Sequence, residues 1–348
     1  MSNLMAARVL ITGGSGYFGS LLVRKLLQSG ARCRVFDLND AVDRPPEVEF
    51  FQGDIRDSAA VVRACQGMEI VHHNVAQVPL AKDRHLFLTV NEQGTEILLQ
   101  AARAASVRKV IYTSSSAVFG VPKSNPVNED VPPRPAEAYG RAKYEGENIC
   151  SRLIAQGLDV SIIRPRTILG HGRLGIFQIL FEWIRRGANV PVLGDGQNVY
   201  QFVHADDLAA AAILAGDRAG PRIYHCGAEQ FGTMRETLEA LCAHASTGSK
   251  VRSVPLTAAT WGMRLTSALG LSPLGPYHAL MYGRSMYFDI SRAKAELGWQ
   301  PRYGNREMFI ESYEWYLRHR EEVLSSVGGS HHRSAVKQGI LQLVGRFL

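Results

Sequence analysis

The glycine-rich segment at residues 12–19, TGGSGYFG, is the feature that most constrains the fold. It follows an apolar run, ARVLIT, and precedes a segment with helical periodicity that ends at a glycine. Glycine permits a tight turn and close approach of the backbone to a pyrophosphate, and the start of a helix offers free N–H groups to that anion. This order of elements predicts a dinucleotide site that uses Gly13, Gly16, Tyr17, Phe18 and Gly19.

Strand-like and helix-like segments alternate through the first half of the chain. Apolar runs at residues 33–37, 48–54, 69–73, 109–116 and 159–165 are separated by helical patterns, one of which spans roughly 86–105. Such alternation predicts an α/β fold, a Rossmann-type doubly wound parallel sheet covered on both faces. The less regular second half predicts a smaller C-terminal substrate lobe.

Carboxylates after the second and third strands suggest how the adenosine half of a dinucleotide is held. Asp37 ends the second strand and is followed by Leu38 rather than arginine. A carboxylate there accepts hydrogen bonds from the ribose hydroxyls and repels a 2′-phosphate, so we predict NAD(H) rather than NADP(H). The alternative is an aspartate that merely begins a loop. Asp54 and Ile55 are expected to flank the adenine, with an ordinary turn as the alternative.

These patterns suggest a division of the chain into domains. We predict an NAD-binding Rossmann domain over residues 1–165, to which residues 198–225 return. Residues 166–197 and 226–322 are expected to form the substrate lobe. Residues 323–348 are expected to form a linker and a basic amphipathic tail.

The segment AYGRAK places Tyr139 and Lys143 one turn apart on the same face of a predicted helix. One interpretation is a surface pair that contributes little to stability. The other is a phenol whose pKa is lowered by the neighbouring ammonium group, so that it can exchange a proton near neutral pH. The spacing alone leaves both interpretations open.

Composition excludes several other classes of protein. The net charge of +7 is modest; it suits an anionic cofactor or membrane surface, and no nucleic-acid signature accompanies it. The five cysteines are scattered without a CxxC pair, which is typical of a reduced, cytoplasmic protein without a metal site or disulfides. No apolar run of about 18 residues is present, so no membrane-spanning helix is expected.

The ordered set of motifs over roughly residues 7–320 resembles the extended short-chain dehydrogenase/reductase superfamily, also called the NAD-dependent epimerase/dehydratase family. The motifs include TGGSGYFG, GDIRD, YTSSSAVFG, YGRAK, IIRP, FVHADDLAAA and DISRAKAELGWQP. The resemblance implies that Tyr139 exchanges a proton with a carbonyl or alcohol. It also implies that Lys143 holds the nicotinamide ribose and lowers the phenol pKa, and that Ser115 hydrogen-bonds the reacting oxygen.

Neighbouring residues have more ordinary interpretations. Ser114 and Ser116 are alternatives to Ser115. His72 and His73 are expected to be core or loop histidines, and Asn91 is expected to be structural.

Departures from the family pattern bear on the reaction. Dehydratases carry an Asp-Glu pair where this chain has Ser116 and Ala117, so we set dehydration aside. Epimerases of nucleotide sugars usually hold the diphosphate with an asparagine and an arginine, where this chain has Thr167 and Tyr200. A nucleotide-sugar 4-epimerase nevertheless remains an alternative, because three arginines are available to compensate: Arg164, Arg166 and Arg173.

RPRTILGHG and RSMYFDISRAKAELGWQP resemble the 3β-hydroxysteroid dehydrogenase and dihydroflavonol-reductase branch, whose members act on apolar alcohols and ketones. Residues 254–287 are expected either to line an apolar pocket or simply to pack the lobe. The pocket residues would be Met263, Leu265, Leu269, Leu271 and Met281. The chain as a whole also resembles bacterial reductases of 3-oxo-sphingolipids, which implies a lipid substrate.

The end of the chain, residues 334–348, combines basic residues with an apolar helical stripe. This pattern favours peripheral contact with the inner face of a membrane, with packing on the body or on another subunit as the alternative. The family resemblance also implies a homodimer. A rival from another class is a non-catalytic NAD-binding subunit.

Overall fold

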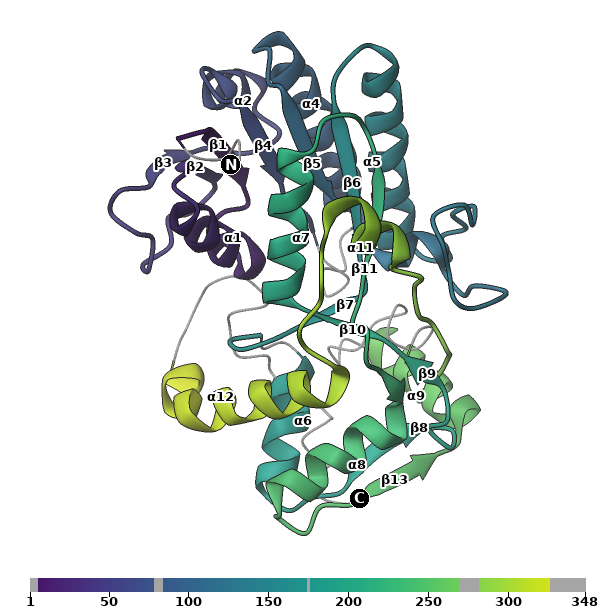
Figure 1. The fold of residues 1–348 in the computed structure, drawn as a ribbon. Helices are drawn as coiled ribbons and strands as arrows, with labels where there is room; N and C mark the ends of the chain where they lie inside the picture. The colour runs from purple at the N-terminus through teal and green to yellow at the C-terminus, as the bar shows by residue number, and fades with distance from the viewer. Residues whose placement is uncertain (1–5, 78–83, 174–175, 269–281, 326–348) are drawn as a thin grey trace.

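The computed structural model describes residues 6–77, 84–173, 176–268 and 282–325, and it confirms the predicted α/β fold (Figure 1). A seven-stranded sheet has the order β11-β6-β5-β4-β1-β2-β3, and its strands pair in parallel. The strands are β1 (Arg8–Thr12), β2 (Arg32–Asp37), β3 (Glu49–Gln52), β4 (Ile70–His73), β5 (Lys109–Thr113), β6 (Val160–Pro165) and β11 (Ile223–Cys226).

The strand order reverses at β1, which pairs with β2 on one side and with β4 on the other. In open α/β sheets, ligands bind at such a switch point, outside the carboxyl ends of the strands. The glycine loop at residues 13–16 follows β1 directly and therefore lies at this point.

Helices cover both faces of the sheet (Figure 1). One buried apolar cluster joins the sheet to residues of α1 (Tyr17–Gln28), α7 (Ala205–Asp217) and α11 (Ser291–Leu297). A second cluster joins it to residues of α2 (Ser58–Cys65), α4 (Gly94–Ala104) and α5 (Ala138–Ala155). The two layers follow from strands that are apolar on both faces, as expected for a covered parallel sheet.

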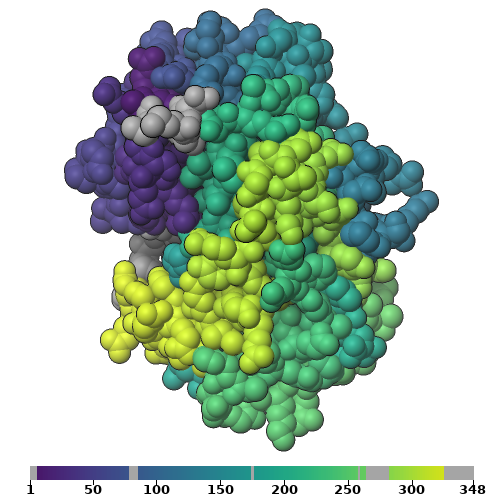
Figure 2. Space-filling view, viewed as in Figure 1, coloured from purple at the N-terminus to yellow at the C-terminus, as the bar shows by residue number. Residues whose placement is uncertain are grey.

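The remaining elements form a lobe with its own apolar core, below the sheet in Figure 1. Its helices are α6 (Ile176–Arg185), α8 (Met234–Ala245), α9 (Leu256–Ala268) and α12 (Asn305–Ser325). Its strands pair as β7 (Thr167–Leu169) with β10 (Phe202–His204), β8 (Val190–Leu193) with β13 (Val251–Val254), and β9 (Val199–Tyr200) with β12 (Gly232–Thr233). On the face shown in Figure 2, the yellow surface of α11 and α12 extends from the sheet half to this lobe.

The helix expected over roughly 86–105 is present as one continuous helical segment with three consecutive parts, α3 (Arg84–Leu86), the π-helix η1 (Phe87–Gln93) and α4. The junction of η1 and α4 passes close to the core, because a Cβ on Gly94 would lie 2.7 Å from the Ile55 side chain. At the other end of the chain, α12 continues to Ser325, so 323–325 are helical rather than linker.

Several sequence predictions fall outside the described residues. Residues 269–281, which include part of the expected apolar pocket, and the amphipathic tail at 334–348 are among them. Within the described ranges, no helix combines the length and the hydrophobicity needed to cross a membrane.

Candidate active site

The phosphate loop is shaped by glycine. Gly13 has a φ of +70°, a conformation that favours glycine. A Cβ on Gly19 would lie 2.1 Å from the Gly13 carbonyl oxygen, so the first turn of α1 can pack this closely on the loop only with glycine. The first turn of α1 carries no acidic residue, which leaves its N–H groups and positive dipole end suited to a phosphate. The loop therefore fits the pyrophosphate of a dinucleotide.

The aromatic residues after the loop are held by different surroundings. The Tyr17 hydroxyl donates a hydrogen bond to the backbone oxygen of His171 at 3.2 Å. Phe18 packs against the apolar cluster that contains α1 and α7. The sequence prediction assigned both residues to the cofactor, and the structure ties one of them to a segment of the lobe.

Asp37 lies at the carboxyl end of β2, beside the loop. Its carboxylate accepts hydrogen bonds from the backbone N–H of Ser15 at 3.1 Å and of Leu38 at 2.8 Å. Burial raises the pKa of this carboxyl, and the backbone hydrogen bonds oppose the increase. The group is placed where a ribose would meet it in this fold.

The residues predicted to flank the adenine are already engaged. The Asp54 carboxylate accepts hydrogen bonds from the Arg56 guanidinium at 2.9 and 2.5 Å. Ile55 is 4% exposed and belongs to the apolar core with Phe36. Asp54 and Ile55 therefore support the turn after β3 through contacts within the protein.

The predicted catalytic residues converge from two elements. Ser115 follows β5, and its hydroxyl hydrogen-bonds the phenol of Tyr139 near the start of α5. The Glu137 carboxylate caps α5 by accepting hydrogen bonds from the backbone N–H of Tyr139 and Gly140, at 2.8 and 2.6 Å. This cap satisfies N–H groups that the helix cannot pair itself and fixes where the tyrosine emerges.

The two flanking serines have other partners. The Ser114 hydroxyl donates to the Glu147 carboxylate at 2.5 Å. The Ser116 hydroxyl accepts a hydrogen bond from Arg166 at 2.8 Å. Among the three serines, Ser115 is thus the one whose hydroxyl meets the phenol.

The expectation that Lys143 makes Tyr139 acidic is wrong in this structure. Burial raises the pKa of Tyr139 to about 12, and the Ser115 hydrogen bond and the Arg173 charge lower it only in part. The Lys143 ammonium donates to the Thr113 backbone oxygen at 2.8 Å and lies 5.0 Å from the centre of the Tyr112 ring. Burial lowers the pKa of Lys143 to about 8. Desolvation of the phenol therefore outweighs the cations near it.

A buried ion pair that the sequence did not reveal supports this region. Glu147 lies on α5 two turns beyond Tyr139, and Arg164 lies on β6. The guanidinium donates to both carboxylate oxygens, at 2.9 and 2.6 Å, and both side chains are at most 5% exposed. The signal was the continuation of the Tyr139 and Lys143 stripe to a carboxylate at the next i+4 position.

His73 and Asn91 are hydrogen-bonded within the core, as expected, whereas both ring nitrogens of the buried His72 lack a hydrogen-bond partner among the described residues. His73 is hydrogen-bonded through both ring nitrogens, to Thr12 at 2.8 Å and Thr95 at 3.0 Å. Burial lowers the pKa values of His72 and His73 to about 3, so both rings are neutral at physiological pH. Asn91 is buried in η1, where it hydrogen-bonds the backbone of Gln77 through both its oxygen and its nitrogen.

Comparison with known families places this geometry in context. The model of the NAD dependent epimerase/dehydratase family matches residues 9–227, more than half of the chain. The chain belongs to this family. It is therefore an NAD-dependent enzyme that acts on CH–OH or carbonyl groups, and its cofactor is NAD(H).

Similar proteins in this family differ in the reactions for which they are named. Uncharacterized protein y4nG of Sinorhizobium fredii is 55% identical over 96% of this chain and 85% of its own length. UDP-glucose 4-epimerase of Mycolicibacterium smegmatis is 31% identical over 89% of this chain and 98% of its own length. A 3β-hydroxysteroid dehydrogenase/Δ5→4-isomerase of Mycobacterium tuberculosis is 28% identical over 95% and 96% of the two chains.

A solved structure supports the cofactor assignment. The UDP-glucose 4-epimerase of Thermus thermophilus in complex with NAD has a TM-score of 0.72 and is 28% identical, with 89% of this chain and 99% of that one covered. The family is thus established for this chain, and its substrate is a separate question that depends on residues outside the NAD site.

The positions that distinguish epimerases of this family are neutral here. The hydroxyls of Thr167 and Tyr200 are hydrogen-bonded to each other at 2.9 Å. Arg164 is committed to Glu147. Arg166 is 1% exposed, and its guanidinium lies 4.6 Å from the centre of the Tyr200 ring. These two arginines are therefore occupied or enclosed by the protein.

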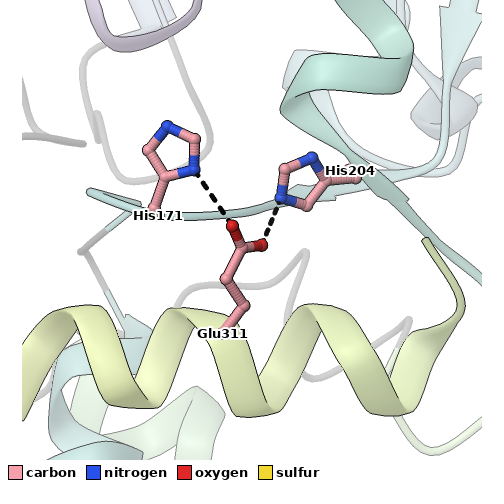
Figure 3. A group of neighbouring side chains, drawn as sticks. All are labelled: His171, His204 and Glu311. Atoms are coloured by element: carbon pink, nitrogen blue, oxygen red, sulfur yellow. Dashed lines mark hydrogen bonds and ion pairs between the residues drawn. The ribbon is translucent and has the colours of Figure 1, made fainter. Parts of the chain in front are cut away.

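A cluster of His171, His204 and Glu311 joins the strands β7 and β10 of the lobe to its helix α12 (Figure 3). His204 Nε2 lies 2.7 Å from one Glu311 oxygen, and His171 Nδ1 lies 3.4 Å from the other. His204 Nδ1 accepts from the Asp206 backbone N–H and caps α7, which assigns the ring proton to Nε2. A metal ion on Nε2 would require that proton to leave. The geometry therefore fits hydrogen bonds from the ring to Glu311 better than metal ligation.

Proposed function

We propose that this enzyme interconverts a ketone and a secondary alcohol on a hydrophobic, lipid substrate, with reduction of a 3-oxo-sphingolipid (3-oxo-ceramide or 3-oxo-sphinganine) as the specific reaction. The Thr167–Tyr200 hydroxyl pair carries the proposal, because these residues stand where nucleotide-sugar epimerases usually present donors to a diphosphate. Two neutral hydroxyls that satisfy each other are poor partners for a dianionic group. They suit a substrate without one.

NADH, when bound, supplies the hydride that the carbonyl carbon accepts. As negative charge develops on the carbonyl oxygen, the Tyr139 phenol gives it a proton, and the Ser115 hydroxyl orients that oxygen by hydrogen bonding. A phenol with a pKa of about 12 is protonated throughout the physiological range, so it is ready to act as the donor. Lys143 is assigned to the nicotinamide ribose, and Asp37 to the adenosine ribose.

A nucleotide-sugar 4-epimerase is the second candidate. It is supported by the 31% identity to a protein named UDP-glucose 4-epimerase, and it would use the same serine, tyrosine and lysine to oxidise and re-reduce the sugar. Arg173 is the one of the three arginines noted above that is neither enclosed with Tyr200 nor paired with Glu147. The substrate experiment must therefore include both classes.

The test is an assay of the purified full chain against 3-oxo-lipids in micelles and UDP-sugars in parallel. We expect NADH oxidation, followed by the absorbance of the reduced nicotinamide, with a 3-oxo-lipid and its loss in Tyr139→Phe. Epimer formation from a UDP-sugar without net change in NADH would establish the second candidate instead. Full biological function of Tyr139→Phe would favour a non-catalytic NAD-binding subunit.

We propose the domain division from the sequence as the working map for truncation, with three changes: β9 and β10 belong to the lobe, α11 packs on the sheet, and α12 continues to Ser325. Peripheral membrane contact through residues 334–348 and a homodimer are also retained as proposals. Deletion of residues 329–348 should weaken sedimentation with anionic liposomes, and unchanged sedimentation would remove the membrane proposal.

A further inference from the structure

We infer that Arg173 binds an oxyanion, a phosphate or carboxylate, at the junction of the phosphate loop and Tyr139. An oxyanion from the cofactor is independent of the proposed function, whereas an oxyanion from the substrate rests on the proposed ketone–alcohol reaction but requires a lipid with a phosphate or carboxylate head group in place of 3-oxo-ceramide. The contacts, the loop geometry and the surrounding charges of Arg173 carry it.

The Arg173 side chain is partly buried, and among the described residues it has no ionic partner. Its guanidinium lies 5.5 Å from the centre of the Tyr17 ring, and its Nε donates to the Ile168 backbone oxygen at 3.3 Å. Within the described ranges, its terminal nitrogens make no hydrogen bond and no acidic group forms an ion pair with it. The donors that remain form the planar fork that matches phosphate and carboxylate oxygens.

The titratable groups near Arg173 connect this position to the site. The phenols of Tyr17, Tyr139 and Tyr282 interact with the guanidinium, and burial lowers the pKa of Arg173. A guanidinium at this depth is stabilised when an anion joins it. Tyr17 begins α1 and Tyr139 begins the catalytic stripe of α5, so a ligand here would meet both halves of the site.

The carboxylates close to the neighbouring Tyr17 already have cationic or hydrogen-bonding partners. Asp206 pairs with Lys25 at 2.8 Å, and Glu311 accepts from His204 at 2.7 Å. These are the two acidic groups that influence the pKa of Tyr17. Neither is therefore available as the missing partner of Arg173.

The segment that carries Arg173 is held in place before any ligand arrives. Gly170 and Gly172 have φ values of +141° and +75°. A Cβ on Gly170 would lie 3.0 Å from His204 Nε2 and 3.1 Å from the Tyr17 hydroxyl, so the turn packs directly on both. His171, in the middle of the turn, is bound by Tyr17 on its backbone and by Glu311 on its ring (Figure 3). A preorganised cation loses little freedom on binding an anion.

The oxyanion has two chemically equivalent sources. The first is the cofactor diphosphate, which the phosphate loop places near Tyr17. The second is an acidic head group on a substrate that, unlike 3-oxo-ceramide and 3-oxo-sphinganine, carries one, and it would enter from the side of Tyr139. Both place phosphate or carboxylate oxygens against the same guanidinium, so the experiment must separate them.

Arg173→Gln removes the charge, Arg173→Lys retains it, and Arg252→Gln on the exposed strand β13 is the matched control for net charge. NADH affinity is measured by fluorescence titration, which needs no turnover. Dodecyl phosphate and dodecanol are then titrated into each NADH complex as an anionic and a neutral probe of the same chain length. Thermal unfolding of every variant establishes that it is folded.

If the NADH dissociation constant rises about tenfold in Arg173→Gln but not in Arg173→Lys or Arg252→Gln, the oxyanion belongs to the cofactor. If the NADH dissociation constant of Arg173→Gln is unchanged, and the wild type binds dodecyl phosphate about tenfold more tightly than dodecanol while Arg173→Gln does not, the oxyanion belongs to the substrate. The inference would be overturned if wild type and Arg173→Gln had the same dissociation constant for NADH, the same for dodecyl phosphate and the same for dodecanol. Should Arg173→Gln not fold, Arg173→Met removes the same charge and takes its place, and the same outcomes support or overturn the inference. These readouts remain valid if no 3-oxo-lipid is reduced, so failure of the proposed function is seen separately.

Discussion

Replacing Glu147 by glutamine should destabilise the protein strongly, because it leaves the Arg164 guanidinium buried without its counter-ion. The two side chains are 5% and 3% exposed, and they are joined at 2.6 Å. Removing one partner of a buried ion pair costs about 3–5 kcal/mol. Glutamine keeps the volume and one oxygen acceptor for Ser114, so the loss is mainly electrostatic.

The size of the effect on melting follows from the length of the chain. An unfolding entropy of about 2.1 cal/mol/K per residue gives about 0.7 kcal/mol/K for 348 residues. A loss of about 3–5 kcal/mol therefore lowers the melting temperature by about 4–7 °C. Differential scanning calorimetry of the wild type and of Glu147→Gln measures this difference directly.

An exposed ion pair supplies the matched control. Arg222 and Glu296 are joined at 3.3 Å, with side chains 46% and 28% exposed. Arg222→Gln should cost at most about 1 kcal/mol, because solvent screens an exposed pair. The double variant Glu147→Gln/Arg164→Met should recover part of the loss, since it removes the unpaired charge. Similar melting temperatures for Glu147→Gln and Arg222→Gln would refute the reasoning.

Three further predictions concern the cofactor site and the lobe. Gly19→Ala should raise the NADH dissociation constant at least about tenfold, because its Cβ would lie 2.1 Å from the Gly13 carbonyl oxygen; a constant equal to wild type would contradict this. Asp37→Ser should lower the NADH/NADPH ratio of kcat/KM by about tenfold or more, because a carboxylate there repels a 2′-phosphate. An unaltered ratio would count against the role of Asp37. The hydrogen bond to Glu311 raises the pKa of His171; Asp206 adds to the increase, whereas burial and Lys25 oppose it. The stability that this pair contributes is therefore present below the pKa of His171 in the unfolded chain, about 6.5, and is lost as the pH rises through the higher pKa of the folded protein. His171→Gln should thus cost about 0.2–1 kcal/mol at a pH of about 6 and less at a pH of about 9 in urea unfolding, and an equal cost at both would argue against the ion pair.

Local patterns in the chain were enough to predict the Rossmann-type sheet and the NAD loop. The spacing of glycines in TGGSGYFG and the apolar run before it depend on neighbours within a few residues, and both act through backbone geometry. The same is true of Tyr139 and Lys143, which any helix over AYGRAK would place on one face. The position of Asp37 at the end of β2 could be predicted because a strand end is visible in the sequence.

The pKa of Tyr139 could not be predicted from such local patterns. The Tyr139 pKa depends on how much water the folded chain removes from the phenol and on Arg173, which is 34 positions away in the sequence. Burial is a sum over all surrounding segments, and local spacing contains no information on it. For this reason the expected acidic phenol became a phenol with a pKa of about 12.

Ion pairs between residues distant in the sequence could not be predicted from the order of residues either. Glu147 meets Arg164 because α5 packs beside β6, and His171 meets Glu311 because α12 returns to the turn after β7. Charges interact through space with a strength that depends on separation and burial, so the chain order of these residues says nothing of their energy. Helix, strand and loop are encoded by near neighbours, whereas the electrostatics of the site arise only when distant segments are packed together.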